Sequence, residues 1–359
     1  FPLSLPLQRP LRMAIATVSE RTTIVVRIRT DDGLTGLGEA VAATYFTGET
    51  LASAHHLITD VIGPELIGTD PTELVGIRRR MAGMVVRNEA ARAAVEMALH
   101  DLGARAAGVP LFDWYGGRTR ADVPTIWHVS GSEPAELAES AAVAVREDGY
   151  SIVKVKVGGE VKTDVAKLEA VRETVGADVT ILADANQGWN VPSAVWFSRA
   201  IADLGVAFIE QPVHHSDVFG MAAANRGPVP VAADEGVFDA AALTLHTRLD
   251  AVSAVVVKLM KSAGPIGARE LIAVADAAGI GVHFAGMPGQ SSIGAAHAVH
   301  LASAIPQLAF GAGICPYYLE ADIVDEPLTA THGVLRAPES PGLGIDLDES
   351  SLARFVVDL

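Results

Sequence analysis

The pattern of apolar and polar residues changes once along the chain, near residue 123. Before that point, residues 22–29 (TTIVVRIR) alternate between polar and apolar positions, and a turn at Asp31, Asp32 and Gly33 leads into a returning segment at 34–39. Alternation with a period of two, interrupted by a turn, is typical of an antiparallel hairpin. Three segments with helical spacing follow, at residues 49–62, 73–85 and 89–107.

After residue 123, short β-branched runs alternate with helical stretches. The eight candidate strands are PTIWHV, SIVKVKV, VTILADAN, VAFIEQP, VPVAADE, AVSAVVVKL, IGVHFAG and QLAFGAG. Regular alternation of strand and helix predicts a parallel sheet. Eight units over roughly 200 residues favour its closure into a barrel. We expect the N-terminal part to pack directly on this barrel, and the last residues, from 325 on, to return to that part.

Composition narrows the classes of partner. No apolar stretch approaches the roughly 18–20 residues that span a bilayer, so we expect no membrane insertion. The single cysteine, Cys315, cannot form an internal disulfide, which favours a reducing compartment, and we expect the cytoplasm. The 43 acidic and 27 basic residues give a formal net charge of −16, which argues against nucleic acid and anionic lipid as partners. An anionic substrate would therefore need a local cluster of positive charge.

Polar and charged residues stand at the ends of successive candidate strands, where a purely structural strand would stay apolar. In chain order they are Lys154 and Lys156, Asp184 and Asn186, Glu210, Asp234 and Glu235, and Lys258. The groups are about one strand–helix repeat apart, so each should reach the C-terminal rim of its own strand. Active sites of (β/α)8 barrels lie at that rim.

The residue types at this rim indicate a reaction. Three converging carboxylates, Asp184, Glu210 and Asp234, would raise one another's pKa unless a cation lay between them. Ligands that are all oxygen favour Mg²⁺ or Mn²⁺ over zinc. Lysines on the flanking strands, Lys156 and Lys258, could then remove and return a proton next to a substrate carboxylate, while the metal stabilises the enediolate.

A structural explanation competes with this one. A single charged residue at a strand end is most often a solvated rim residue or part of an internal salt bridge. The ordered series of lysine, acid, acid, acid and lysine on successive strands favours a functional site instead. A metal-binding barrel without catalytic activity stays the alternative from another class of protein.

The motifs KVKV, DANQGW, IEQP, ADEG, KLMKSAG and SSIGAAHAVHLA, with GLTGLGEA near the start and PGLGIDLDE near the end, together resemble the enolase superfamily, in its muconate-lactonizing subgroup. The resemblance covers nearly the whole chain. It implies a modified, TIM-like (β/α)8 barrel over residues 121–324. It also implies an α+β capping domain built from residues 1–120 and 325–359. Barrels of this family tend to form symmetric homo-oligomers.

The resemblance also implies a role for each rim residue. Asp184, Glu210 and Asp234 would bind Mg²⁺, Lys156 and Lys258 would be the acid/base pair, Lys154 would tune Lys156, and Asn186 and Glu235 would lie around the metal ligands. The substrate would be a small carboxylate. Activities in this subgroup include cycloisomerisation of muconates, racemisation of N-acylamino acids and epimerisation of dipeptides.

Differences between this sequence and the family pattern favour some of these activities over others. Gln290 stands where relatives commonly have Glu, and we expect it to donate a hydrogen bond to a substrate carboxylate. Residues 310–313 (FGAG) contain nothing ionisable, although cycloisomerases place a Glu at the end of the eighth strand, so the chemistry would rest on the lysines alone. GICPYYLEAD lacks the paired aspartates of dipeptide epimerases. This difference favours muconate-type cycloisomerisation, with racemisation or epimerisation of N-acylamino acids or dipeptides as the alternative.

Other residues give weaker signals. His128 ends the first strand and could line the pocket or pack in the core. Tyr45 and Phe46, next to Gly48, could form a lid over the site or pack between the domains.

Three more histidines are expected to be structural. His283, at the end of the seventh strand, is predicted to be a hydrogen-bonded barrel residue and not a base. His297 and His300 lie one helical turn apart without a third ligand, and we expect them on a helix surface.

Overall fold

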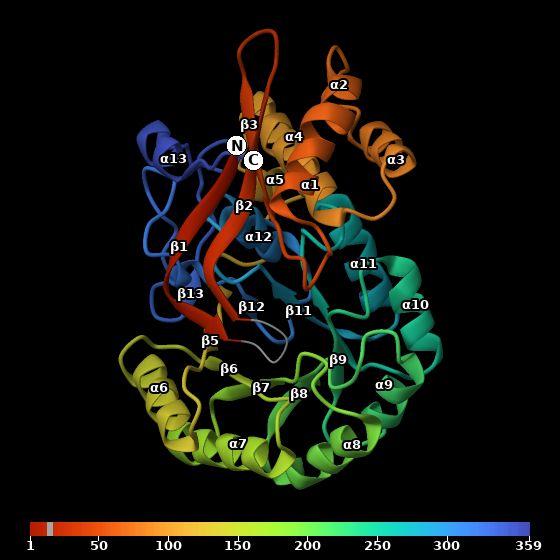
Figure 1. Cartoon of the computed structure of the whole chain (residues 1–359), viewed down its shortest axis with the longest axis vertical. Coiled ribbons are helices and arrows are strands. Elements are labelled where there is room, and N and C mark those ends of the chain that lie inside the picture. The colour runs from red at the N-terminus through yellow and green to blue at the C-terminus, as the bar shows by residue number, and fades with distance from the viewer. Residues whose placement is uncertain (13–16) are drawn as a thin grey trace.

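An eight-stranded parallel sheet dominates the computed structural model, which describes residues 1–12 and 17–359 (Figure 1). The strands are β5 (Trp127–His128), β6 (Ile152–Lys156), β7 (Thr180–Asp184), β8 (Val206–Glu210), β9 (Val231–Ala233), β10 (Ala254–Val257), β11 (Gly281–Ala285) and β12 (Ala312–Gly313). Neighbours in the sheet follow chain order from β5 to β12. A parallel bridge between Thr125 and Ala312 brings the first and last strands together, so the predicted TIM-like barrel is confirmed.

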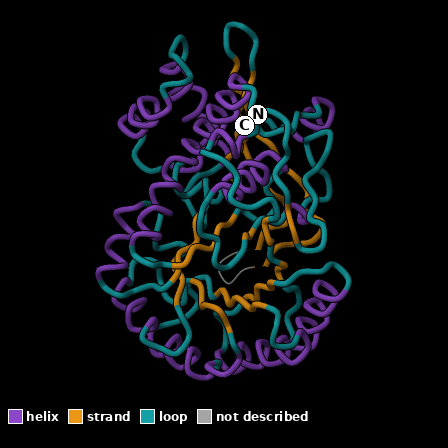
Figure 2. The backbone as a smooth tube through the Cα atoms, turned by 180° about the vertical axis from the view of Figure 1, so that it is seen from behind, coloured by secondary structure: helices purple, strands orange, loops and turns teal. Residues whose placement is uncertain are grey.

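Helices surround the strands, as Figure 2 shows. The helices are α6 (Pro134–Arg146), α7 (Val161–Val175), α8 (Val191–Ala200), the short 3₁₀ helix η2 (Ala202–Leu204), α9 (Val218–Asn225), α10 (Ala240–Arg248), α11 (Pro265–Ala277) and α12 (Ser292–Ala304). Burial on both faces explains why the strands are so apolar: all four residues of β10, AVVV, are fully buried. None of the helices in the described part of the chain is long and apolar enough to cross a membrane.

A three-stranded antiparallel sheet covers one end of the molecule. It consists of β1 (Pro2–Arg12), β2 (Thr17–Arg29) and β3 (Thr35–Val41), in that order. The predicted hairpin is β2–β3, whereas β1 was not predicted because its prolines interrupt the alternation. The helices that follow are α1 (Leu51–His56), the π-helix η1 (Leu57–Ile62), α2 (Gly63–Leu66), α3 (Leu74–Met84), α4 (Glu89–Ala107) and α5 (Leu111–Trp114).

The glycines of GLTGLGEA allow α4 to lie directly on β3. A Cβ added at Gly36 would come within 2.1 Å of the Ala98 carbonyl oxygen, and one at Gly38 within 2.0 Å of the Ala94 carbonyl oxygen. Only glycine permits so close an approach of strand and helix backbones. The alanines of α4 complete the fit, because their small side chains bring the helix axis close to the sheet.

The C-terminal tail returns to the capping sheet. The 3₁₀ helix η3 (Pro316–Tyr318) comes before this tail, and α13 (Glu349–Phe355) lies near its end. Between them, β13 (Val334–Leu335) pairs with β4 (Val123–Pro124). An antiparallel bridge joins Leu3 of β1 to Val356. The N-terminal sheet and the C-terminal tail are therefore in direct contact, while the domain boundaries at 120/121 and 324/325 stay a prediction.

The prediction that His297 and His300 lie on a helix surface is wrong. Both are on α12 and are fully buried between the barrel and the capping domain. His297 Nε2 is 2.8 Å from the carbonyl oxygen of Leu37, and His300 Nε2 is 3.1 Å from that of Leu343. Their polar atoms thus join α12 to β3 and to the C-terminal tail.

Because burial lowers the pKa of His297 from 6.5 to about 3, we expect it to make folding stability depend on pH. The unfolded chain takes up this proton near pH 6.5 and the folded chain only near pH 3, so stability is complete above pH 6.5 and falls as pH decreases between these values. In His297→Gln, which keeps a donor for Leu37, the slope of unfolding free energy against pH should be smaller by about 1.4 kcal/mol per pH unit.

Urea unfolding at pH 7, 6, 5 and 4 measures this slope. The matched control is His214→Gln, because His214 is exposed. Identical slopes for wild type and His297→Gln would contradict the assignment.

Candidate active site

Strand register brings three of the predicted site residues side by side. Lys156 is paired with Asp184 between β6 and β7, and Asp184 with Glu210 between β7 and β8. Lys156 Nζ donates to Asp184 Oδ2 at 2.6 Å. Lys154, two residues earlier and therefore on the same face, places Nζ 2.6 Å from Glu210 Oε2 and 3.5 Å from Asp184 Oδ2. Because a charged residue ends each successive strand, the strand–helix repeat produces a continuous row of charges across the sheet.

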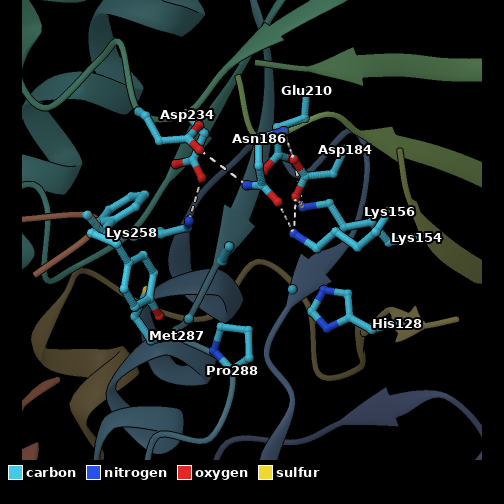
Figure 3. A pocket seen from close by; sticks show the side chains of 16 residues that line it. His128, Lys154, Lys156, Asp184, Asn186, Glu210, Asp234, Lys258, Met287 and Pro288 are labelled. Carbon is cyan, nitrogen blue, oxygen red and sulfur yellow. Dashed lines mark hydrogen bonds and ion pairs between the residues drawn. The ribbon is translucent and has the colours of Figure 1, made fainter. Parts of the chain in front are cut away.

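Two lysines hold the next acid of the row. Lys258 directly follows β10, and its Nζ donates to Asp234 Oδ2 at 2.5 Å. Lys261 lies in the following turn, and its Nζ donates to Asp234 Oδ1 at 2.8 Å and to the Asp234 carbonyl oxygen at 2.7 Å. Lys258 and Lys156 therefore approach the acids from opposite sides, as Figure 3 shows.

Asn186 connects the two sides. Its Oδ1 accepts a hydrogen bond from Lys156 at 2.7 Å, and its Nδ2 donates to Glu235 Oε1 at 3.2 Å. Its φ of 40° lies in the left-handed region, which a non-glycine residue adopts at a cost in free energy. Backbone strain at a residue that joins a lysine to an acid is typical of a functional site.

A cavity of about 50 Å³ lies among these groups. Its lining includes the predicted residues Tyr45, Phe46, His128, Lys154, Lys156, Asp184, Asn186, Glu210, Asp234, Glu235 and Lys258. Gln290 is absent from it. Its Oε1 accepts from the Met287 amide at 2.9 Å, and its side chain lines a smaller neighbouring cavity, together with Lys258.

The buried carboxylates repel one another. Burial raises the pKa of Glu210 to about 8, and the negative charge of Asp184 adds to the shift. Burial, together with Asp234, raises the pKa of Glu235 to about 7. Glu235 Oε2 is buried without a hydrogen-bond partner among residues 1–12 and 17–359. Burial and the neighbouring acids therefore oppose the ionisation of Glu210 and Glu235.

The pKa of an acid next to the lysines is shifted in the opposite direction, to a lower value. Burial would raise the pKa of Asp184, but Lys156 and Lys154 outweigh it and hold this pKa well below its usual value. For the same reason burial would lower the pKa of Lys258, but Asp234 and Glu210 outweigh it and raise that pKa. The pKa of Lys258 is raised because a carboxylate is its direct partner in this arrangement.

Asp184, Glu210 and Asp234 are the candidate ligands for a divalent cation. Within the described part of the chain, no three acidic, histidine or cysteine side chains are grouped so that they could hold a metal ion. Ammonium groups lie among the acids instead, as the short contacts of Lys154 and Lys258 show. In donor type Asp184, Glu210 and Asp234 nevertheless fit a hard cation such as Mg²⁺, because all their donor atoms are carboxylate oxygens.

Comparison with known proteins identifies the family. Residues 3–116 match the model of the mandelate racemase/muconate lactonizing enzyme N-terminal domain, and residues 136–351 match that of the enolase C-terminal domain-like family. The chain belongs to the enolase superfamily. Within it, this protein is similar to the muconate-lactonizing group, as the motifs predicted.

Relatives of the chain carry more than one activity. The N-succinyl-L-Arg/Lys racemase of Bacillus cereus is 32% identical, with 99% of this chain and 96% of that protein covered, and its crystal structure superposes with a TM-score of 0.95. The L-Ala-D/L-Glu epimerase of Bacillus subtilis is 34% identical over 96% of this chain and 94% of that protein. The muconate cycloisomerase 1-2 of Acinetobacter lwoffii is 31% identical over 98% and 93%. These similarities support an isomerase-type enzyme without selecting one reaction.

In this superfamily member, the turn after β3 lies over the cavity. The amides of Phe46, Thr47 and Gly48 all donate to the Ala43 carbonyl oxygen, which makes the turn compact. The Phe46 ring stacks on Phe238, with centroids 5.7 Å apart, and its centroid is 4.4 Å from Lys258 Nζ. Phe46 therefore covers the lysine and also joins the capping domain to the barrel, while a lid function of this turn stays a prediction.

The two histidines at strand ends differ in their surroundings. His128 lines the cavity, and its Nδ1 is 3.0 Å from the Tyr318 hydroxyl oxygen. Burial and the nearby Lys154 hold the pKa of His128 well below 6.5, so its ring is neutral. His283 is fully buried, with Nδ1 3.0 Å from the Gly311 carbonyl oxygen, as expected of a hydrogen-bonded barrel histidine.

Two residues of the site were missed in the sequence. Lys261 follows Lys258 by three residues, and Gln211 follows Glu210 directly. Gln211 Oε1 accepts from the amides of Asp234 and Gly236, each at 3.0 Å, and so fixes the turn that presents Asp234. The signal was present in KLMKSAG and IEQP, but Lys261 lies beyond its candidate strand and Gln211 is not ionisable.

If Phe46 covers Lys258, removing the ring should expose the amine. We expect Phe46→Ala to raise the rate at which an amine-acylating reagent modifies Lys258 about fivefold, since a cation–π contact contributes about 1 kcal/mol. Peptide mass spectrometry after timed labelling measures the rate. Phe219→Ala, which removes an exposed ring on α9, is the matched control. Equal labelling of Lys258 in both variants would show that the ring does not protect it.

Proposed function

We propose that this chain is an enzyme that moves the proton α to the carboxylate of a small carboxylic acid, with Lys156 and Lys258 as its acid/base pair. One observation carries the proposal. Two ammonium groups approach one cavity from opposite sides, each within 2.6 Å of a different carboxylate in a continuous row of acids. With one lysine as the neutral amine and the other as the ammonium, a proton can be removed from one face of a carbon atom and another delivered to the opposite face.

Asp184, Glu210 and Asp234 would hold Mg²⁺, and Mn²⁺ is a second option with the same preference for oxygen. When bound, the cation supplies positive charge beside the substrate carboxylate, where negative charge develops during proton removal. Other residues of the chain position the acids and lysines and exclude water. Asn186 orients Lys156, Lys261 orients Asp234, and Phe46 excludes water from Lys258.

The two-sided arrangement supports racemisation or epimerisation, for example of an N-acylamino acid. With lysines on both faces and no ionisable residue at 310–313, one lysine removes the proton and the other returns it. Muconate-type cycloisomerisation, which the sequence favoured, is the second candidate. It requires the same removal or return of an α proton by one lysine, and similarity to muconate cycloisomerases over nearly the whole chain supports it.

Single-lysine variants test the two-sided mechanism in D₂O. We expect Lys156→Ala and Lys258→Ala each to lower racemisation of N-succinyl-phenylalanine by a factor of about 10² to 10⁴, the usual contribution of a general base. Each variant should still exchange the α proton of one enantiomer, the one whose proton faces the remaining lysine. ¹H NMR with Mg²⁺ present measures exchange, and a chiral separation measures racemisation.

Lys162→Ala, on the exposed side of α7, is the control for these variants. Formation of muconate from muconolactone, without racemisation of any N-acylamino acid, would select the second candidate. A wild-type protein that exchanges no acid of either class would favour the third possibility, a metal-binding barrel without catalytic activity.

Metal binding is tested apart from turnover. Titration calorimetry with Mg²⁺ and with Mn²⁺ should show one site in the wild type, and its affinity should decrease at least tenfold in Glu210→Gln, which removes a ligand charge. Release of protons on binding is also expected, because burial holds the pKa of Glu210 at about 8. Binding of equal strength in the variant would remove Glu210 from the ligand set.

A further inference from the structure

The turn that carries Lys258 is held from outside the barrel. This turn runs from Lys258 to Gly264, between β10 and α11, and it also contains Lys261. Arg78, on α3 of the capping domain, donates from Nη1 to the carbonyl oxygen of Ala263 at 3.1 Å. A side chain of the capping domain thus binds the backbone of the segment that carries two lysines of the site.

Glu96, on α4, holds the end of the same turn. Its Oε1 accepts from the Ile266 amide at 2.7 Å, in the first turn of α11, which lies next to the capping-domain helices (Figure 1). The N-cap residue of α11 is Gly264, which has no side chain that could accept from this amide. A carboxylate at this place also interacts favourably with the helix dipole. Glu96 therefore caps α11 from another domain.

Arg78 and Glu96 are bound to each other. Arg78 Nη1 is 3.1 Å from Glu96 Oε2, and on its exposed side Arg78 Nη2 donates to Glu270 Oε2 at 3.3 Å. Burial raises the pKa of Glu96 to about 7, and Arg78 opposes this shift, so the carboxylate is mostly ionised at pH 8. His100 Nε2 lies 4.0 Å from Glu96 Oε1, but burial lowers the pKa of His100 to about 3 and its ring is neutral. Arg78 and Glu96 therefore form an ion pair at pH 8.

The backbone of the turn is strained where this ion pair holds it. Ala263 has a φ of 55° and Gly264 a φ of 114°. A non-glycine residue adopts such a φ at a cost in free energy, so surrounding contacts must keep Ala263 in this conformation. A Cβ added at Gly264 would come within 2.5 Å of Glu96 Oε1, which shows how closely the carboxylate lies against this backbone. The conformation of the turn therefore depends on contacts with the capping domain.

Hydrogen bonds inside the turn connect its end to Lys258. The Ser262 amide donates to the Lys258 carbonyl oxygen at 3.1 Å, and the Gly264 amide donates to that of Leu259 at 2.9 Å. Met260 lies between them and is buried in the apolar cluster of the capping domain. A shift at the end of the turn would therefore displace the backbone of Lys258.

The lysine on the opposite side of the cavity is held differently. Lys156 ends β6, and its Nζ donates to Asp184 and Asn186, which are both barrel residues. Lys258 is bound by a barrel residue as well, but its turn is also bound by α3 and α4. Loss of the ion pair between Arg78 and Glu96 should therefore affect one lysine and leave the other in place.

We propose that Arg78 and Glu96 are positioning residues for Lys258, through which the capping domain fixes one of the two lysines of the proposed acid/base pair. The proposal rests on the proposed function, because it concerns proton transfer at that same site. A salt bridge that only joined two domains would stabilise the fold and affect both lysines alike. Contacts with the Ala263 carbonyl and the Ile266 amide instead place this ion pair at the turn of one lysine.

Exchange of the two enantiomers of one substrate tests the proposal. N-succinyl-phenylalanine is used in D₂O at pH 8 with Mg²⁺, and the enantiomer whose exchange is lost in Lys258→Ala is the one that Lys258 serves. We expect Arg78→Met to lower kcat for this enantiomer roughly 10- to 100-fold, the effect of a small misplacement of a reacting group. KM should change little, because the substrate contacts are unaltered. The other enantiomer should exchange at the wild-type rate, since Lys156 stays in place.

Further variants separate positioning from support of the fold. Arg78→Lys keeps the charge and one donor and should retain part of the lost exchange, while Glu96→Gln, which removes the charge, should slow the same enantiomer as Arg78→Met. Arg79→Met, at the next and exposed position of α3, is the matched control and should leave both rates unchanged. A smaller folded fraction lowers both rates equally, so the ratio of the two rates does not depend on stability. A wild-type ratio in Arg78→Met and Glu96→Gln would assign the ion pair to the fold and overturn the proposal.

Amine labelling keeps this inference separate from the proposed reaction. If the wild type exchanges neither enantiomer, the proposed function fails for this class of acid, and labelling followed by peptide mass spectrometry decides the proposal. Arg78→Met should then be modified at Lys258 at least about threefold faster than the wild type, because a turn that loses hydrogen bonds to a charged group opens more often. Lys156 should keep its rate. An equal change at both lysines, or a change at neither, would then overturn the proposal.

Discussion

Mutual neutralisation of charged groups at one end of the barrel is the constraint on which the site depends. The groups are the ammonium ions of Lys154, Lys156, Lys258 and Lys261 and the carboxylates of Asp184, Glu210, Asp234 and Glu235. Most of these side chains are almost fully buried. Taking one such ion out of water costs several kcal/mol, and removing one partner of a buried pair typically destabilises a protein by about 3–5 kcal/mol. The cluster therefore holds together as a unit, and its members cannot be exchanged singly without effect.

The periodic part of this cluster could be predicted because a closed parallel sheet converts sequence spacing into proximity. Lys156, Asp184 and Glu210 are direct partners in the ladder, so counting one residue per repeat was sufficient to place them together. The same count located Lys258 on the far side. The barrel itself followed from eight alternations of strand and helix, even though the eighth strand, expected at 307–313, is reduced to Ala312–Gly313.

What could not be predicted depends on turns and on contacts between distant segments. Lys261 reaches Asp234 because the chain turns after β10, where alternation along the strand no longer gives the direction of a side chain. His297 and His300 were assigned to a surface because their spacing fits a solvated helix face. Their burial results from the capping domain and the C-terminal tail, which supply Leu37 and Leu343 as acceptors from far away in the sequence. No local pattern carries that information.

The balance of charges also bears on what the cavity can accept. Four ammonium groups and four carboxylates cancel, so a divalent cation bound among the acids would leave an excess of two positive charges in a poorly hydrated space. Such an excess favours the entry of an anion together with the cation. If a divalent cation binds as proposed, a chain with net charge −16 can still accept an anionic substrate, because the positive charge of this cavity then exceeds its negative charge.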